Sequence, residues 1–225
     1  MFAQRRLLVV FVSGICALLP AALLGAGSSE PAKADQVDPS ASRVFIKVGS
    51  ATALGHPHGI EGQLKSGKVT FGGDGELVFD MNSFTADTAE SHKRTGLEGE
   101  KTSSADAKKI TDTMRGKEVL DTARFPTATF HMNAVTPLDQ QAPGAPGMYQ
   151  LNGKFTLHRT EKDLQIKAKL EAPPDQKSQQ LKLTGSFKIK QSDYGIKPYS
   201  TFGGAAKVSD ELEIIGDLLL KPVGK

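Results

Sequence analysis

The chain changes character at Arg124-Phe-Pro-Thr-Ala-Thr-Phe130, after the run-in Met114-Arg-Gly-Lys-Glu-Val-Leu-Asp-Thr-Ala123. A polar, partly helical segment lies before this stretch, and a long series of predicted strands follows it. Pro126 cannot continue a helix, and it favours an extended backbone at Phe125. From residue 127 to 132 polar and apolar residues alternate, which is the pattern of a half-buried strand.

The same alternation recurs along most of the chain. A first strand is predicted at 43–48, and the Gly72–Gly75 turn is predicted to join a hairpin. After Pro126 come four longer alternating stretches, at 148–157, 164–170, 181–189 and 212–220. Consecutive strands joined by short polar loops favour an antiparallel meander, and closure into a barrel removes its exposed edges. The sequence therefore predicts an all-β fold, an antiparallel β-barrel.

Residues 82–116 interrupt this pattern and are predicted to carry a short helix. Ser103 is a suitable N-cap with Asp106 reaching back to it, and Gly116 stands where the helix is expected to end. The buried face of this helix would consist of Ala107, Ile110 and Met114. A second short turn is predicted at Glu118–Thr122. The expected barrel thus has one or two short helices in an insert.

The N-terminus has the pattern of a secretory signal peptide. Arg5 and Arg6 precede the largely apolar stretch 7–24, and small residues follow at 24–26 and 32–34. We expect residues 1–34 to be removed on export, which leaves a periplasmic or secreted protein without stable membrane insertion. The alternative is an uncleaved membrane anchor, because the apolar run is close to spanning length. Residues 35–42 are predicted to be a flexible leader, and residues 43–225 to form a single barrel domain.

Composition narrows the classes of partner. The chain has 28 Lys and Arg and 25 Asp and Glu, of which residues 1–34 hold three and one, so the expected mature chain has 25 and 24 and a net charge of +1. No basic cluster alternates with aromatic residues, so nucleic acid is not an expected partner. Cys16, the single cysteine, lies in the expected signal peptide, so stability must come from the core and not from disulfides.

No motif indicates catalysis. The chain has no Gly-x-Ser-x-Gly elbow, no phosphate-binding loop and no dinucleotide fingerprint. Asp210 and Glu211 are adjacent, so on a strand they would point to opposite faces and not act as an acid–base pair. We therefore expect a protein that is not an enzyme and has no cofactor.

His56 and His58 are the clearest candidates for a metal site. In an extended backbone their imidazoles lie on the same side, which could begin a zinc or copper site with His131 or His158 as third ligand. Pro57 between them makes a rigid turn the simpler explanation. Metal binding through this pair is the alternative function.

Small residues interrupt the inward rows of the predicted strands at Gly153, Ala168, Gly185 and Gly216. They would either leave room inside the barrel or mark points where the sheet bends around a filled interior. The first interpretation predicts a ligand tube, and the second a scaffold or interaction protein with a filled core.

Four landmarks resemble the YceI-like family, in order and at sensible spacing: 114–130, Tyr149–His158, the strand 164–170, and Asp193–Ile196. The resemblance covers about residues 43–222. It implies a lipocalin-like antiparallel barrel of about eight strands, periplasmic or secreted, that holds a long isoprenoid or similar amphipathic chain. The chain departs from the family pattern at Gly55-His-Pro-His-Gly59, where many members have a single His, and in a longer segment 86–113.

The free energy gained by burying an apolar chain also favours a long ligand over a short one. Each buried methylene contributes about 0.8 kcal/mol, whereas association costs roughly 4–15 kcal/mol. The expected ligand is therefore an isoprenoid quinone, a polyprenyl or a fatty-acyl chain, bound for carriage or for stress protection. A chain longer than one tube would favour a homodimer.

Two sets of residues are predicted to contact this ligand. The tube lining is predicted to be Phe71, Phe79, Phe130, Phe155, Phe187, Ile189, Ile214 and Leu218. The polar rim, which would receive a head group through hydrogen bonds or charge, is predicted to be His56, His58, Tyr194, Lys197 and Tyr199.

Overall fold

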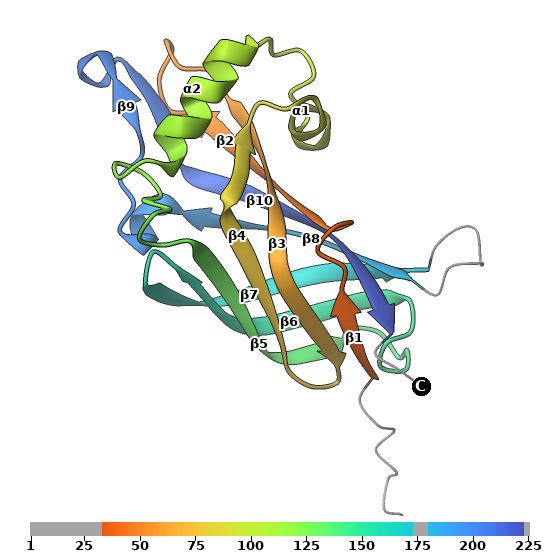
Figure 1. Cartoon of the computed structure of the whole chain (residues 1–225). Coiled ribbons are helices and arrows are strands. Elements are labelled where there is room, and N and C mark those ends of the chain that lie inside the picture. Colours follow the sequence, from red (N-terminus) through yellow and green to blue (C-terminus); the bar gives the residue numbers. More distant parts are fainter. Residues whose placement is uncertain (1–32, 173–179, 223–225) are drawn as a thin grey trace, which may run out of the picture. The chain divides into compact units, whose positions relative to one another are not determined.

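The computed structural model of the chain describes residues 33–172 and 180–222. Apolar residues at every second position turn inward, so eight antiparallel strands bury one common interior and close into a barrel (Figure 1). The barrel strands, in the order in which neighbours are hydrogen-bonded, are β2 (Arg43–Ser50), β3 (His58–Phe71), β4 (Gly75–Ala86), β5 (Thr127–Pro137), β6 (Gly147–Leu157), β7 (Thr160–Glu171), β8 (Leu181–Lys190) and β10 (Ala206–Pro222), which pairs back with β2. The predicted antiparallel barrel of about eight strands is confirmed. The predicted signal peptide, apart from residues 33 and 34, lies outside the described residues.

A further strand, β1 (Lys33–Val37), closes a gap at one end of the barrel. It pairs with β3 on one side and β10 on the other, beyond the point where β2 begins. Val37 is buried, and Pro39, which has no N–H to donate, separates β1 from β2. The prediction of a flexible leader at 35–42 is therefore wrong for residues 35–37. Because β3 and β10 extend past β2, their backbone groups there need another strand as partner.

Helix α2 (Ser104–Arg115) confirms the predicted helix. The Ser103 hydroxyl accepts the N–H of Asp106 at 3.1 Å and donates to its carboxylate at 2.7 Å. Gly116 follows the helix, but its φ of −69° and ψ of 171° are extended and not left-handed. Hydrogen-bonded turns then cover residues 116–122, as predicted.

Helix α1 (Ala89–Thr95) was not predicted. Thr88 caps its first turn, and Gly96 ends it with a left-handed φ of 70°. The helix packs against β2 and β3 on the outside of the barrel, and Arg94 binds the carboxylate of Asp217 in β10 through two hydrogen bonds of 2.6 and 2.8 Å. Seven residues are too few for a helical pattern of apolar residues to be recognised.

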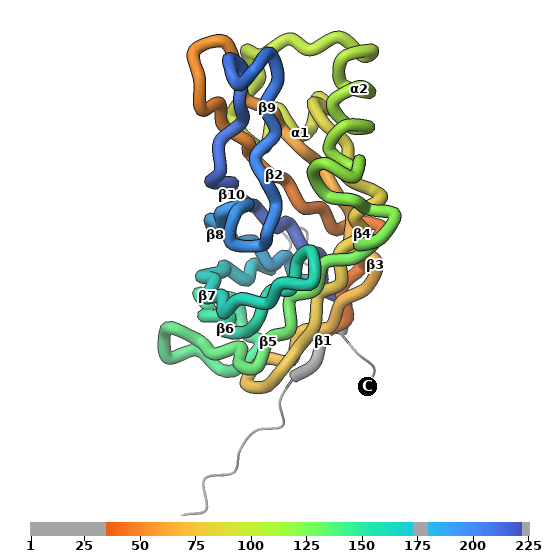
Figure 2. The backbone as a smooth tube through the Cα atoms, turned by 90° about the vertical axis from the view of Figure 1, so that its left-hand side faces the viewer, coloured from red at the N-terminus to blue at the C-terminus, as the bar shows by residue number. Residues whose placement is uncertain are grey.

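The β8–β10 connection contains three short elements: η1 (Gln191–Tyr194), β9 (Ser200–Thr201) and η2 (Phe202–Gly204). Of these, β9 pairs with the start of β10. The connection reaches the end of the barrel where α2 lies (Figures 1 and 2).

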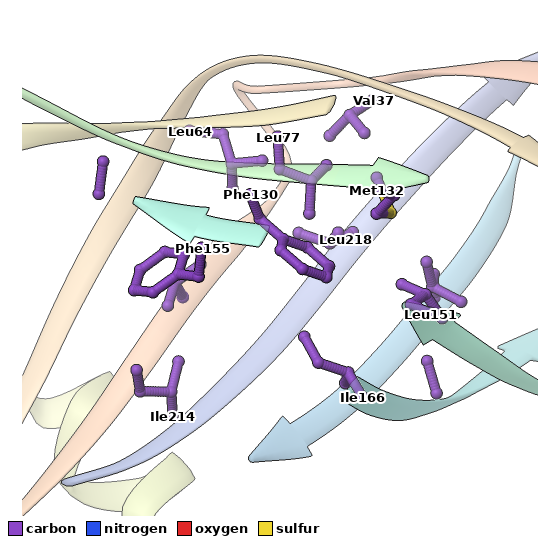
Figure 3. Close-up of a cluster of buried hydrophobic side chains, with 14 of the residues drawn as sticks. Val37, Leu64, Leu77, Phe130, Met132, Leu151, Phe155, Ile166, Ile214 and Leu218 are labelled. Carbon is purple, nitrogen blue, oxygen red and sulfur yellow. The ribbon is translucent and has the colours of Figure 1, made fainter. Parts of the chain in front are cut away.

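The end of the barrel next to β1 is solidly packed. Phe71, Met132 and Tyr149 have no exposed surface, and the rings of Phe71 and Tyr149 are 4.9 Å apart. Figure 3 shows side chains from several strands, among them Phe130 and Leu218, converging in the adjoining core. Buried side chains of the described residues therefore fill the interior at that end.

Candidate functional site

The opposite end of the barrel contains a cavity of about 620 Å³. Three segments line its mouth: the β2–β3 loop, the region from Lys101 through α2, and residues 199–208. All three lie at the same end of the barrel (Figures 1 and 2). The wall below the mouth is formed mainly by apolar side chains of the strands, such as Val44, Ile46 and Val48 of β2, Met81 and Phe84 of β4, and Leu212 of β10. The described wall carries no charged side chain, so the cavity suits apolar matter.

Helix α2 forms one side of the mouth because two of its residues anchor it to β4. Arg115 donates from Nε to the carbonyl oxygen of Phe84 at 2.9 Å, and the hydroxyl of Thr111 accepts the N–H of Ala86 at 2.9 Å. Ile110 and Met114, two of the three residues predicted to form the buried face of this helix, line the cavity.

A smaller hollow of about 50 Å³ lies among the lining residues Ala168, Gly185 and Gly216 and shares wall residues with the large cavity. Gly153 has a different role, because a Cβ there would collide with the carbonyl oxygen of His131. The interior is therefore open at one end, nearly full in the middle and packed at the end next to β1. The interpretation that small residues leave room inside the barrel therefore holds near the cavity, and the interpretation of a filled interior holds toward β1.

The predicted tube residues occupy three levels of this interior. The large cavity is lined by Phe79, Phe155, Phe187, Ile189 and Ile214. Phe130 and Leu218 border only the small hollow. Phe71 lines neither and belongs to the packed end, because it is the last residue of β3, where β1 closes the barrel.

The predicted rim residues are not all brought together. His56, His58 and Tyr199 lie at the cavity mouth. Tyr194 is buried with its ring 5.7 Å from that of Phe155, and burial raises the pKa of its hydroxyl. Lys197 is exposed and lies outside the lining, so neither of these two residues belongs to the rim.

His58 is held by a buried carboxylate that sequence reasoning missed. Its Nδ1 lies 2.8 Å from one oxygen of Asp87, and Nε2 of His92 lies 3.0 Å from the other. Burial alone would raise the pKa of Asp87, but hydrogen bonds from the two histidines and the Gly59 N–H lower it to about 2. The ionised carboxylate accepts both bonds, so His58 donates from Nδ1.

The structure does not extend the His56–His58 pair into a metal site. The two rings are 4.6 Å apart, but His131 lies beside Glu76 and His158 packs on Phe125. Across residues 33–172 and 180–222, no three His, Cys, Asp or Glu side chains are grouped to hold a metal ion. Nor does any helix in these ranges have the length and apolar content needed to cross a bilayer.

Other mouth residues also escaped prediction. Leu54 of the β2–β3 loop and Phe202 of η2 are large apolar residues at the mouth and are 74% and 82% exposed. Three lysines lie around them, Lys101, Lys109 and Lys207. No local pattern marks these residues, since three separate loops and helices bring them together.

Comparison with known proteins finds a matching family model and similar solved structures. The YceI-like domain model matches residues 36–219. The crystal structure of BcnA from Burkholderia cenocepacia aligns with a TM-score of 0.51 at 19% identity, over 81% of this chain and 98% of that one. A structure described as a polyisoprenoid binding domain from Saccharophagus degradans, implicated in plant cell wall breakdown, aligns with a TM-score of 0.58 at 15% identity, over 85% and 99%. A comparison with curated protein sequences finds no significant match. At such identities the likeness in structure extends to the fold alone, and it is the match to the family model, over most of the length, that shows that the chain belongs to the YceI-like domain family.

Proposed function

We propose that the protein is a periplasmic or secreted carrier that holds a long apolar chain, an isoprenoid or a fatty-acyl group, inside its barrel and catalyses no reaction. The observation that carries this proposal is the apolar cavity of about 620 Å³ with a polar mouth and a packed far end. Its volume lies within the roughly 300–1,000 Å³ typical of small-molecule sites.

The volume also sets the length of chain that fits. The cavity of about 620 Å³ corresponds to about twenty water molecules at ~30 Å³ each, and a methylene group is of similar size, so roughly twenty carbons can be enclosed. Burying them contributes roughly 16 kcal/mol, which exceeds the ~4–15 kcal/mol cost of association. A short acyl group would gain too little to stay bound.

Other observations support the remaining parts of the proposal. The similar Saccharophagus degradans structure is described as a polyisoprenoid binding domain. Residues 1–34 have the pattern of an export signal. The described lining contains no Ser or Cys, and the hydrogen bond described for the His58 ring is to Asp87 and not to one of the lining Thr hydroxyls.

The test is native mass spectrometry of the protein expressed with its signal sequence, followed by organic extraction. We expect a bound mass that extracts as an isoprenoid or acyl chain. A mass that stays unliganded after incubation with quinones and fatty acids would favour the scaffold alternative, and an excess equal to one divalent metal would favour the His56–His58 site.

A matched pair of variants in β8 locates the ligand. Ile189 lines the cavity, whereas Ser186 faces outward and is exposed on the same strand. Ile189→Trp should fill part of the cavity and abolish binding, and Ser186→Trp should leave binding unchanged. Equal binding by two folded variants would place the ligand elsewhere.

A further inference from the structure

The mouth of the cavity exposes large apolar side chains, which is unusual for this chain. Among the described residues three large hydrophobic side chains are exposed, Leu54 at 74%, Phe202 at 82% and Leu138 at 47%. Leu54 and Phe202 both line the mouth, whereas Leu138 follows β5 and lines neither cavity. Single exposed apolar residues need no explanation, but two at the rim of one opening form a surface.

Phe202 combines an exposed ring with an uncommon backbone conformation. Phe202 has a φ of 52°, a region that bulky residues avoid, and it is followed by Gly203 and Gly204, whose φ values are 64° and 95°. Since 82% of Phe202 is exposed, packing within the described chain does not compensate for this conformation. A contact between the Phe202 ring and a partner outside the chain would compensate for it.

Positive charge surrounds the same opening. Lys101, Lys109 and Lys207 are exposed lining residues, and none forms a salt bridge with another described residue. The acidic residue among the described lining residues is Asp106, whose carboxylate accepts a hydrogen bond from Ser103. The described lining of the cavity thus carries three lysines against one aspartate, a net charge of +2, although the expected mature chain is nearly neutral.

Hydrogen bonds join two of the segments that carry these residues. The N–H of Ala51 donates to the carbonyl oxygen of Lys207 at 2.8 Å, and the N–H of Lys207 donates to the hydroxyl of Thr52 at 3.1 Å. Both views show the β2–β3 loop and the β9 region at the same end of the barrel as α2 (Figures 1 and 2). The apolar and basic side chains therefore form one surface around the cavity.

We propose that this surface docks on an anionic lipid bilayer. Leu54 and Phe202 enter the interface between head groups and acyl chains, and Lys101, Lys109 and Lys207 contact anionic head groups. In this position the cavity opens onto the bilayer, and an apolar chain can pass between them without crossing water. Docking does not require a bound chain, so it can fail or succeed independently of the proposed carrier function.

The chain has no tryptophan, which allows a single-site reporter. Phe202→Trp should show a blue-shifted emission with vesicles containing anionic phosphatidylglycerol, and lipids brominated in the acyl chain should quench it. Leu138→Trp should show neither effect. An equal shift for both reporters, or none for Phe202→Trp, would overturn the proposal, and so would a shift that rises with protein concentration without vesicles, because it would identify a second copy as the partner.

The charge requirement is tested by vesicle co-sedimentation. Replacing Lys101, Lys109 and Lys207 by Gln should weaken binding to anionic vesicles about a hundredfold, since each lysine near an anionic surface contributes roughly fivefold. The control replaces three exposed lysines outside the lining, Lys65, Lys68 and Lys162. It removes the same charge and should retain binding. An equal loss in both triple variants, or equal binding of the wild type to neutral and anionic vesicles, would contradict the proposal.

Discussion

Two inward glycines of this barrel are expected to respond in opposite ways to replacement by alanine. One faces a close backbone contact, and the other faces open space. Neither Gly153 of β6 nor Gly216 of β10 has a left-handed φ, so alanine meets no strain in φ at either position. At Gly153 the new Cβ would collide with the carbonyl oxygen of His131 and lie 2.8 Å from Cα of Met132. At Gly216 the nearest atom is the carbonyl oxygen of Gly185 at 3.9 Å, beside the hollow of about 50 Å³.

These distances set opposite signs for the change in stability. Either alanine restricts the unfolded chain, which favours folding by ~0.4–1 kcal/mol. Gly216→Ala also buries a methyl group, so its free energy of unfolding should rise by about 1–2 kcal/mol. Gly153→Ala overpacks a backbone contact where the β5–β6 register already shifts, between Met132 and Ala134, so its free energy of unfolding should fall by about 2 kcal/mol.

Urea unfolding followed by circular dichroism measures both values, and equal slopes with denaturant validate the comparison. A Gly153→Ala variant as stable as the wild type would refute the close-contact argument. A Gly216→Ala variant that is destabilised would refute the argument that the hollow has room. Gly216→Leu then extends the test to function, because it fills the hollow and should weaken binding only of chains long enough to reach it.

Low pH, the loop after β5 and the mature N-terminus give further tests. The pKa of Asp87 is about 2 in the fold against 3.8 for an isolated aspartate carboxyl. Its carboxylate should therefore contribute about 2.5 kcal/mol above pH 4 and lose this as pH falls through 2. In denaturant unfolding at stepped pH, Asp87→Asn should lose less stability than the wild type across this window, and equal losses would contradict the assignment. Tyr149→Phe should lower the free energy of unfolding by about 1–3 kcal/mol, because the hydroxyl accepts the Gly144 N–H at 2.9 Å and donates to a carbonyl at 2.7 Å; an unchanged denaturation midpoint would show that water replaces it. Because β1 begins at Lys33, the expected cleavage moves from Ala34 to the earlier small-residue site at Ala26, which keeps all of β1. If the protein is exported as proposed, its intact mass should match cleavage after Ala26, and a mass matching cleavage after Ala34 would show that a shortened β1 suffices.

The sequence predicted those helices and strands that are determined by their own residues and caps. The long strands after Pro126 alternate over enough residues to define an inward face, and α2 is marked by the Ser103 cap at one end and Gly116 at the other. The elements that were missed depend on distant partners. β1 is five residues long and forms because β3 and β10 leave a gap, and α1 is held in part by the contact of Arg94 with Asp217, which is 123 residues away.

The same distinction explains the outcome for the site. Alternation identified Phe71 and Phe187 as inward, but not their level along the barrel axis, which depends on the register of all eight strands. Phe187 therefore lines the cavity and Phe71 lies in the packed end. Asp87 reaches His58 and His92 from a position with a left-handed φ of 52°, and no sequence period indicates such a contact.

A barrel with one opening also constrains the ligand and the oligomeric state. Since the end next to β1 is packed, a chain bound as proposed would enter by its apolar tail and leave its head group at the mouth, near His56, His58 and Tyr199. A chain much longer than the roughly twenty carbons that fit would project from the mouth. Without a bilayer, the projecting part should be covered by a second barrel, mouth to mouth.

Sedimentation velocity with ligands of increasing length tests this consequence. A fatty acid that fits the cavity should leave the protein monomeric, and an isoprenoid of about twice the enclosed length should produce dimers, because covering each exposed methylene contributes about 0.8 kcal/mol. Anionic vesicles should dissociate these dimers, since the bilayer covers the same surface. Phe202→Ser removes a large apolar side chain from the mouth and should weaken both dimer formation and vesicle binding. Leu138→Ser should affect neither. Monomers that retain the long isoprenoid in the absence of vesicles would show that its projecting part folds back onto the barrel, and the link between ligand length and association would then be wrong.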